Sequence, residues 1–369
     1  MSPRSDSRIH SLDGLRFVAA MAVLLYHFSY RGQMGDPYTA FSVPILQPVT
    51  QFFHLGVGLF FVISGFVICW SVLQQNTWDF LRRRFLRLYP AFVIAVFATS
   101  ACALLIGGGL FHATPQNILA NLTFLPQLFG QTFTDGVYWS IVVELIFYGW
   151  VALLAYFGVL QRWFLPTVSA WLSIAILNEF VIQNEIIEHL FLTPHAGYFI
   201  AGMLLYRRMI ARQGEPLDWI YLVLAIAHCV VFEMRRGIPF AENAETQLEL
   251  LSVALATLCV FAMFALTLKI TVPDNLIRYT TLLGAISYPL YLVHQNIGYM
   301  ILNQVDGLLP EYGSLLVAIS LTVGLAWLIT RFAEPRMLGY FRHVLGMIEQ
   351  VARHLRFFPD RRNRIFVSE

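Results

Sequence analysis

The sequence predicts an all-α, polytopic integral membrane helix bundle of about ten transmembrane helices, with both termini in the cytoplasm. Of its 369 residues, 58% are hydrophobic and only 12% are charged, whereas soluble domains carry about 25% charged residues. The apolar runs are long enough to cross the hydrocarbon core of a bilayer. The basic residues gather on alternate connecting segments, as the positive-inside rule requires.

The apolar runs, taken in order between polar breaks, give ten candidate spans. They lie at 15–30, 54–73, 88–108, 137–157, 163–180, 192–206, 217–233, 248–269, 280–302 and 312–332. The stretch 110–136 is moderately apolar, but it holds two prolines and several amides. It is therefore interpreted as a re-entrant or interfacial segment.

Charge fixes the orientation of these spans. With the N-terminus in the cytoplasm, one face receives all of the 24 basic residues except Arg31, Arg235 and Arg236. If one span were added or removed, the basic residues would no longer gather on one face of the membrane. The first apolar run has no small-residue cleavage pattern after it, so a removable signal peptide is not expected. The chain is predicted to be a multi-pass protein of the inner (cytoplasmic) membrane.

Two regions follow from this reading. Residues 1–335 form one transmembrane domain, and residues 336–369 form a basic cytoplasmic tail. Basic and apolar residues alternate along the tail, which predicts an amphipathic helix lying on anionic lipid. The four cysteines lie inside apolar spans without paired spacing, so they are interpreted as small buried hydrophobes, and no metal site is expected.

Arg16 and His27 lie in the first span, separated by ten residues that are almost all apolar. Eleven helical steps carry the chain about 16 Å along the axis, roughly half the hydrocarbon thickness of about 30 Å. If Arg16 lies at the inner face, His27 lies at or beyond the midplane. An ionisable group at that depth costs about 2.5–3.5 kcal/mol. His27 is therefore either functional or hydrogen-bonded inside the bundle.

The predicted orientation places several polar residues at one level in the outer half of the membrane. Those residues are His27, Glu144 and His294, with Trp139 and Ser140 at the top of the fourth span and His54 at the mouth of the second. His54 could equally be an interfacial residue, and His294 could equally be a packed bundle residue.

The inner face carries a second group. Arg84 and Arg87 belong to an arginine cluster after the second span, share one helix face, and lie on the same side as Arg16. The planar donor fork of arginine suits phosphate oxygens, so these three residues could hold an anionic cytosolic ligand. Short basic loops are also what cytoplasmic turns ordinarily contain.

These motifs, in this order, give the chain a specific resemblance. The Arg-x10-His element, GVGLFFVISGF, RRRFLRLYP, YWSIVVE, SYPLYLVH and RFAEP together resemble membrane acyltransferase family 3, the polytopic acyl-CoA-dependent O-acyltransferases. The resemblance runs from Leu12 to about Glu334, and Ile141 stands where the family usually has Leu. Some members of that family carry an appended SGNH hydrolase-like domain. Because only about 35 residues follow the last predicted span, a stand-alone acyltransferase module is expected.

The resemblance implies roles for the two groups. Acetyl-CoA, or another acyl-CoA, would be the donor, held by Arg84, Arg87 and Arg16, with no metal required. His27 would be the general base on an acceptor hydroxyl, and Glu144 would orient its imidazole. His294, Trp139, Ser140 and His54 would support the site or the acceptor.

The expected function is transfer of an acyl group, acetyl above all, from cytosolic acyl-CoA to a hydroxyl of a cell-surface or exported glycan. The alternatives are acylation of a small molecule such as an antibiotic, or a proton- or solute-coupled transporter, which would also bury His and Glu. The expected partners are the donor, the acceptor and the bilayer, but no nucleic acid. A homo-oligomer remains open.

Overall fold

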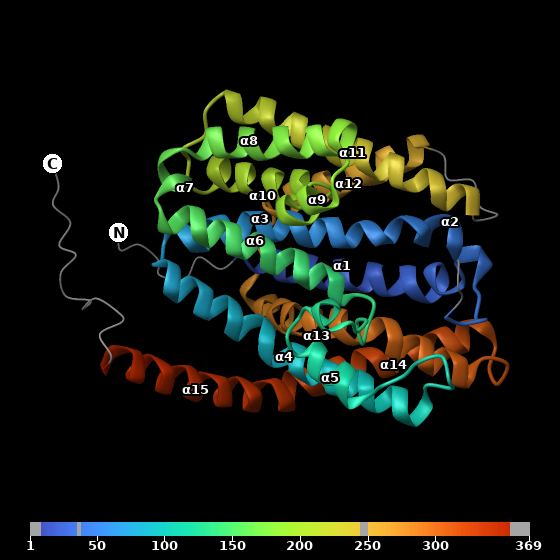
Figure 1. The fold of residues 1–369 in the computed structure, drawn as a ribbon. Helices are drawn as coiled ribbons and strands as arrows, with labels where there is room; N and C mark the ends of the chain where they lie inside the picture. Colours follow the sequence, from blue (N-terminus) through green and yellow to red (C-terminus); the bar gives the residue numbers. More distant parts are fainter. Residues whose placement is uncertain (1–8, 35–37, 244–249, 355–369) are drawn as a thin grey trace.

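The computed structural model describes residues 9–34, 38–243 and 250–354, and all regular structure within these ranges is helical. The predicted all-α class is confirmed. Each of the ten predicted spans overlaps a helix of the bundle in Figure 1: α1 (His10–Ser29), α3 (Gly56–Leu73), α4 (Thr77–Ile106), α6 (Tyr138–Tyr156), α8 (Phe164–Leu177), α10 (Ala196–Met209), α11 (Leu217–Asn243), α12 (Leu250–Thr267), α13 (Asp274–Val305) and α14 (Glu311–Leu328).

Within the described ranges, eight helical segments are long and apolar enough to cross a membrane. The two predicted spans outside this set are α10, which has only 14 residues, and α13, whose middle carries His294, Gln295 and Asn296. The count of ten and the cytoplasmic termini stay predictions. Residues 1–8, with Arg4 and Arg8, and residues 355–369 of the tail lie outside the described residues.

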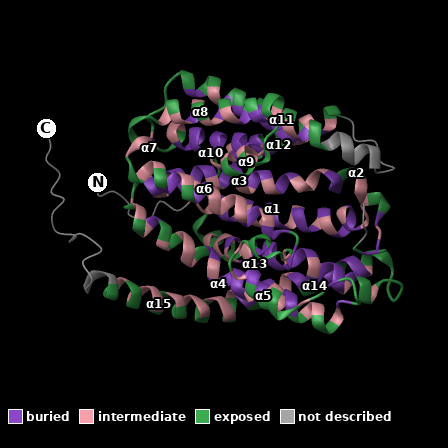
Figure 2. Cartoon of the chain, in the orientation of Figure 1, coloured by how far each residue is buried: buried purple, intermediate pink, exposed green. Residues whose placement is uncertain are grey.

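The short helix α10 lies at the centre of one half of the bundle. Every residue from Ala196 to Tyr206 is buried. In Figure 2, buried residues are more frequent on α1, α3, α10 and α13 than on α8 and α15. The apolar core continues from α10 into α3, where Phe61 and Phe66 are almost fully buried. A helix enclosed by protein on all sides does not have to match the thickness of the lipid.

Glycine allows α3 and α10 to approach within backbone contact. A Cβ atom at Gly65 would lie 2.2 Å from the carbonyl oxygen of Phe199, and one at Gly202 would lie 2.1 Å from that of Val62. Neither position has room for a methyl group. The pair therefore packs through small residues, as membrane helices commonly do.

The stretch 110–136 forms no spanning helix. It contains the short helix α5 (Pro115–Asn121) and a 3-10 turn, Pro126–Phe129. The amide of Asn121 donates to the Thr132 carbonyl at 3.0 Å and accepts from the Thr134 N–H at 2.9 Å. Asn296 of α13 donates to the Thr134 carbonyl at 2.9 Å. These amides fold the segment back on itself and attach it to α13.

The C-terminal helix α15 (Glu334–His354) follows α14 through a π-helical turn, Ile329–Ala333. It lies along the N-terminal half of α4 (Figure 1), where the Phe341 ring contacts Phe85 and Tyr89, and Glu349 pairs with Arg82 at 3.4 Å. The described helix thus covers residues 334–354 and packs on α4 through aromatic contacts. That residues 336–369 form a separate basic tail on anionic lipid stays a prediction.

We expect Gly202→Ala to lower the free energy of unfolding by about 1–3 kcal/mol, because the added methyl group overpacks the contact between α3 and α10. Thermal unfolding in detergent measures the effect. Gly149→Ala in α6 is the matched control, since a Cβ there has no neighbouring atom within 4 Å. Equal stability of the two variants would show that α3 and α10 are not in backbone contact.

Candidate active site

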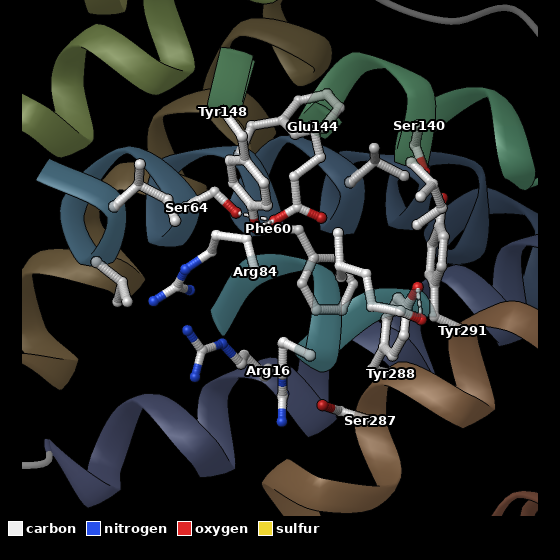
Figure 3. A pocket seen from close by; sticks show the side chains of 17 residues that line it. Arg16, Phe60, Ser64, Arg84, Ser140, Glu144, Tyr148, Ser287, Tyr288 and Tyr291 are labelled. Carbon is white, nitrogen blue, oxygen red and sulfur yellow. Dashed lines mark hydrogen bonds between the residues drawn. The ribbon is translucent and has the colours of Figure 1, made fainter. Parts of the chain in front are cut away.

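A cavity of about 90 Å³ lies between α1, α3, α4, α6 and α13. It brings together five of the residues singled out in the sequence, namely Arg16, Arg84, Arg87, Ser140 and Glu144. Figure 3 shows Arg16 and Arg84 at one end, Glu144 between, and Ser140 beside Tyr291 at the other end. Apolar side chains, among them Val57, Phe60 and Val67, form much of the remaining wall.

At the arginine end of the cavity, several guanidinium N–H groups have no hydrogen-bond partner among the described residues. Arg16 pairs with Asp13 at 3.4 Å, and Arg84 donates to the Ser71 hydroxyl at 2.9 Å. The Nε of Arg84 is buried without a partner among the described residues. Arg87 makes no hydrogen bond or ion pair with another described residue. Guanidinium N–H groups directed into a partly apolar cavity suit an anion with several oxygens.

Glu144 lies in the middle of this cavity, and its carboxylate is held by two hydroxyl groups. It accepts a hydrogen bond from Ser64 at 2.7 Å and another from Tyr148. The Arg84 guanidinium lies 6.0 Å from the centre of the Tyr148 ring. Among the described contacts Glu144 has none with His27, so the expected orienting contact between these two residues is not made.

Two hydroxyl groups close the other end of the cavity. The Ser140 and Tyr291 hydroxyl oxygens lie 2.7 Å apart, and the Ser140 hydroxyl also donates to the Val137 carbonyl at 3.0 Å. Ser140 has one proton, so the Tyr291 hydroxyl donates to Ser140. The Tyr291 carbonyl then accepts a hydrogen bond from Nδ1 of His294 at 2.8 Å. Tyr291 thus links the cavity to the next group of residues.

His27 and His294 form a hydrogen-bonded pair between α1 and α13. Nε2 of the fully buried His294 lies 3.1 Å from Nδ1 of His27, which is also 2.8 Å from the Val23 carbonyl. Carbonyl oxygens only accept, so Nδ1 carries the proton in each ring when both are neutral. The proton positions are assigned from these partners. Nε2 of His27 therefore keeps its lone pair, and it has no hydrogen bond with a described residue.

His54 and Trp139 lie outside this cavity. Nε2 of His54 contacts the Glu233 carboxylate of α11 at 3.3 Å. The Trp139 ring packs on His195, with ring centres 5.4 Å apart. The residues expected at one outer level therefore separate into three groups. Glu144 and Ser140 line the cavity, whereas His27 and His294 pair with each other and do not line it. His54 and Trp139 are turned toward the half of the bundle that contains α10 and α11.

Sequence reasoning missed Tyr288 and Tyr291, which both line the cavity. Their spacing, three residues apart and followed by His294 three residues later, places all three side chains near one face of α13. That spacing within SYPLYLVH was the available signal.

Asp135 clamps the start of α6 to α13. Its fully buried carboxylate accepts the Asn296 backbone N–H at 3.0 Å and the Val137 backbone N–H at 3.2 Å. The first bond reaches α13 two residues after His294, and the second reaches the start of α6. Burial raises the pKa of Asp135 to about 7, although both N–H donors act to lower it.

Comparison with known proteins identifies a family. Residues 9–331 match the family described as "Acyltransferase domain". The chain is 26% identical over 238 residues to "Acyltransferase MdmB" of Streptomyces mycarofaciens, covering 63% of this chain and 59% of that relative. It is 27% identical over 257 residues to "Exopolysaccharide production protein ExoZ" of Rhizobium meliloti (strain 1021), covering 65% and 74%.

A third relative, from Bacillus subtilis (strain 168), is provisionally named the peptidoglycan O-acetyltransferase YrhL. It is 26% identical over 159 residues, which cover 38% of this chain and 22% of the relative. The match to the first of these three relatives thus spans less than two thirds of its length. No solved structure matches the chain significantly.

The clamp predicts a pH dependence of stability. A carboxyl group with a folded-state pKa above its unfolded value stabilises the fold at low pH, and the contribution is lost as the pH rises. The free energy of unfolding should therefore include a term that falls between about pH 4 and pH 7, by up to about 1.4 kcal/mol per pH unit. Thermal unfolding of Asp135→Asn should show a flatter pH dependence than the parent. Identical profiles would contradict the assignment.

Proposed function

Because the chain belongs to the acyltransferase domain family, we propose that it transfers an acyl group from a cytosolic acyl-CoA to a hydroxyl of a cell-surface or exported glycan. Acetyl-CoA is the proposed donor, and the inner membrane is the proposed location. One observation carries the proposal. A single cavity begins at three arginines and ends at Ser140 and Tyr291, and Tyr291 is hydrogen-bonded to the His294 that faces His27.

The arginine end suits the phosphates of the donor. Arg16, Arg84 and Arg87 face Glu144 across the cavity, so cationic groups outnumber the carboxylate. The free N–H groups of Arg84 and Arg87 would bind phosphate oxygens in charge-assisted hydrogen bonds. The apolar walls beyond them suit the uncharged arm that carries the thioester, which leaves the nucleotide at the inner face.

The histidine pair supplies the chemistry. Nε2 of His27 accepts the proton of the acceptor hydroxyl as its oxygen attacks the thioester carbonyl carbon. The carbon–sulfur bond breaks, and the proton passes from His27 to the departing sulfur, which leaves as the CoA thiol. Nδ1–H of His27 donates to Nε2 of His294 and to the Val23 carbonyl. Both acceptors favour the protonated ring that forms during the step.

Glu144 has a different role in this proposal from the one inferred from sequence. Its carboxylate is held by Ser64 and Tyr148 and offsets part of the arginine charge. Its negative charge would lower the repulsion among the arginines until the donor phosphates bind. His294, with the Val23 carbonyl, takes the orienting role.

The names of two relatives support a glycan as the acceptor, since one is an exopolysaccharide production protein and the other is provisionally a peptidoglycan O-acetyltransferase. The second name also supports acetyl as the transferred group and a hydroxyl as its destination.

We expect His27→Gln to reduce acyl transfer by about 10²–10⁴-fold, because the general base is lost. His294→Phe should be strongly impaired, because it removes the acceptor for His27, whereas His294→Gln supplies a side-chain oxygen and should retain more activity. Radiolabelled acyl transfer in membrane vesicles gives the rates. Binding of CoA should be unchanged in all three variants. Near-normal turnover of His27→Gln, or equal rates for the two His294 variants, would contradict the assigned roles.

At the donor end, Arg84→Lys and Arg87→Lys should each weaken CoA binding about tenfold, or 1.4 kcal/mol. Lysine keeps the charge but loses the planar fork of donors. Arg83→Lys is the matched control, since Arg83 lies in the same cluster, is exposed, and does not line the cavity. Isothermal titration of purified protein with CoA gives the affinities. If the three variants bind alike, the cluster serves topology alone.

A further inference from the structure

A second, larger cavity of about 370 Å³ lies between α9 (Glu185–Phe191), α11 and the π-helical turn Asn178–Ile182 that follows α8. It is lined by Glu179, Phe180, Gln183, Glu188, His228 and Arg236, among others. The predicted orientation puts it on the outer side of the membrane, where α11 ends. Its volume falls in the range of about 300–1,000 Å³ that is typical of small-molecule sites. The proposed chemistry uses none of these residues.

Several polar groups in this cavity lack partners. His228 is only 5% exposed, yet neither ring nitrogen has a hydrogen-bond partner among the described residues. The side chains of Gln183 and Arg236 make no hydrogen bond or ion pair with another described residue. A buried polar group without a partner costs about 1–3 kcal/mol. A ligand with hydroxyl groups would relieve that cost at His228.

The charges in the cavity point to an uncharged ligand. Two carboxylates, Glu179 and Glu188, and two guanidinium groups, Arg235 and Arg236, line the cavity, so its formal charges are equal in number. Arg235 is already engaged, because it donates to the Glu179 carbonyl at 2.9 Å and lies 5.0 Å from the centre of the Phe180 ring. An acidic ligand would meet two carboxylates here. A neutral ligand with hydroxyl groups could hydrogen-bond both to the guanidinium donors and to the carboxylate acceptors.

Aromatic rings complete the lining. Phe180 and Phe232 both face the cavity, and Phe180 is 45% exposed. The C–H face of a pyranose ring is apolar and packs on an aromatic side chain, while its edge carries hydroxyls for Gln183, His228 and Arg236. The combination of apolar faces and a few polar groups is that of a site that orients its ligand.

One layer of rings separates this cavity from the first. The His195 ring packs between Phe232 of the second cavity, at 5.8 Å, and Phe61 of the first, at 5.0 Å. Trp139 packs on the same His195 ring. The second cavity therefore lies one layer of rings from the Phe61 wall of the first.

We propose that the second cavity binds a neutral hexose unit of the acceptor glycan, one that does not itself react. This inference rests on the proposed function, and it identifies the acceptor as an uncharged polysaccharide. Binding a remote unit would hold the reacting hydroxyl near the site, where the binding energy favours transfer.

The test is saturation-transfer NMR on the protein in lipid nanodiscs, free of glycoside detergents, with cellotetraose as the neutral probe and tetragalacturonate as the acidic one. We expect cellotetraose to bind and tetragalacturonate to bind more weakly. His228→Leu should weaken cellotetraose binding about tenfold and also raise thermal stability, because it removes a buried unpaired polar group. His112→Leu, at an exposed position outside the cavity, should change neither.

Three results would overturn the inference: no binding of cellotetraose, a preference for the acidic probe, or equal losses in His228→Leu and His112→Leu. Titration of the same nanodiscs with CoA separates this failure from that of the proposed function. Intact CoA binding without sugar binding refutes the sugar site alone, whereas loss of both removes the proposed function as well.

Discussion

The hydrogen bond between His27 and His294 is the interaction on which the rest of this site depends. The buried His294 points its only free nitrogen at His27, because its other nitrogen is held by the Tyr291 carbonyl. That arrangement determines which nitrogen of His27 is basic. It joins α1 to α13, so the chemistry depends on the packing of these two helices. The Asp135 clamp and the folded segment 110–136 hold the C-terminal half of α13 in place.

The two ends of the cavity carry different kinds of polar group. Arginines at one end suit a highly charged donor, and the hydroxyl groups of Ser140 and Tyr291 form the other end. The histidine pair does not line the cavity, and the Tyr291 carbonyl connects the two through its hydrogen bond with His294. The low dielectric of a membrane interior strengthens both kinds of interaction and makes unpaired charge costly. Glu144 lies between the two ends, where it offsets arginine charge without touching the base. In the proposed function, the highly charged part of the donor would stay at the inner face while its acyl group reaches the outer half.

Composition and spacing predicted the helical class and the position of each long helix, because hydropathy and charge determine which segments enter lipid. Residue number along a helix also gives depth, which is why Arg16, Arg84 and Arg87 were expected at one end. Depth does not give the direction in which a side chain points. Depth placed Glu144 and His27 at one level, and the family resemblance implied that Glu144 would orient the imidazole, yet the Glu144 carboxylate accepts from Ser64 and Tyr148. His54 was also expected at this level, but its side chain contacts the Glu233 carboxylate of α11. Such partners depend on helix rotation and on segments distant in sequence, which one sequence does not encode locally.

The central claim is that donor and acceptor reach one site from opposite faces of the membrane. The most direct measurement is acyl transfer in proteoliposomes of uniform orientation, with impermeant acyl-CoA on one side and an impermeant hydroxyl acceptor on the other. The account predicts transfer only when the donor is on the face of Arg84 and Arg87 and the acceptor is on the opposite face, nearer His27. Transfer that requires both substrates on the same face would contradict it.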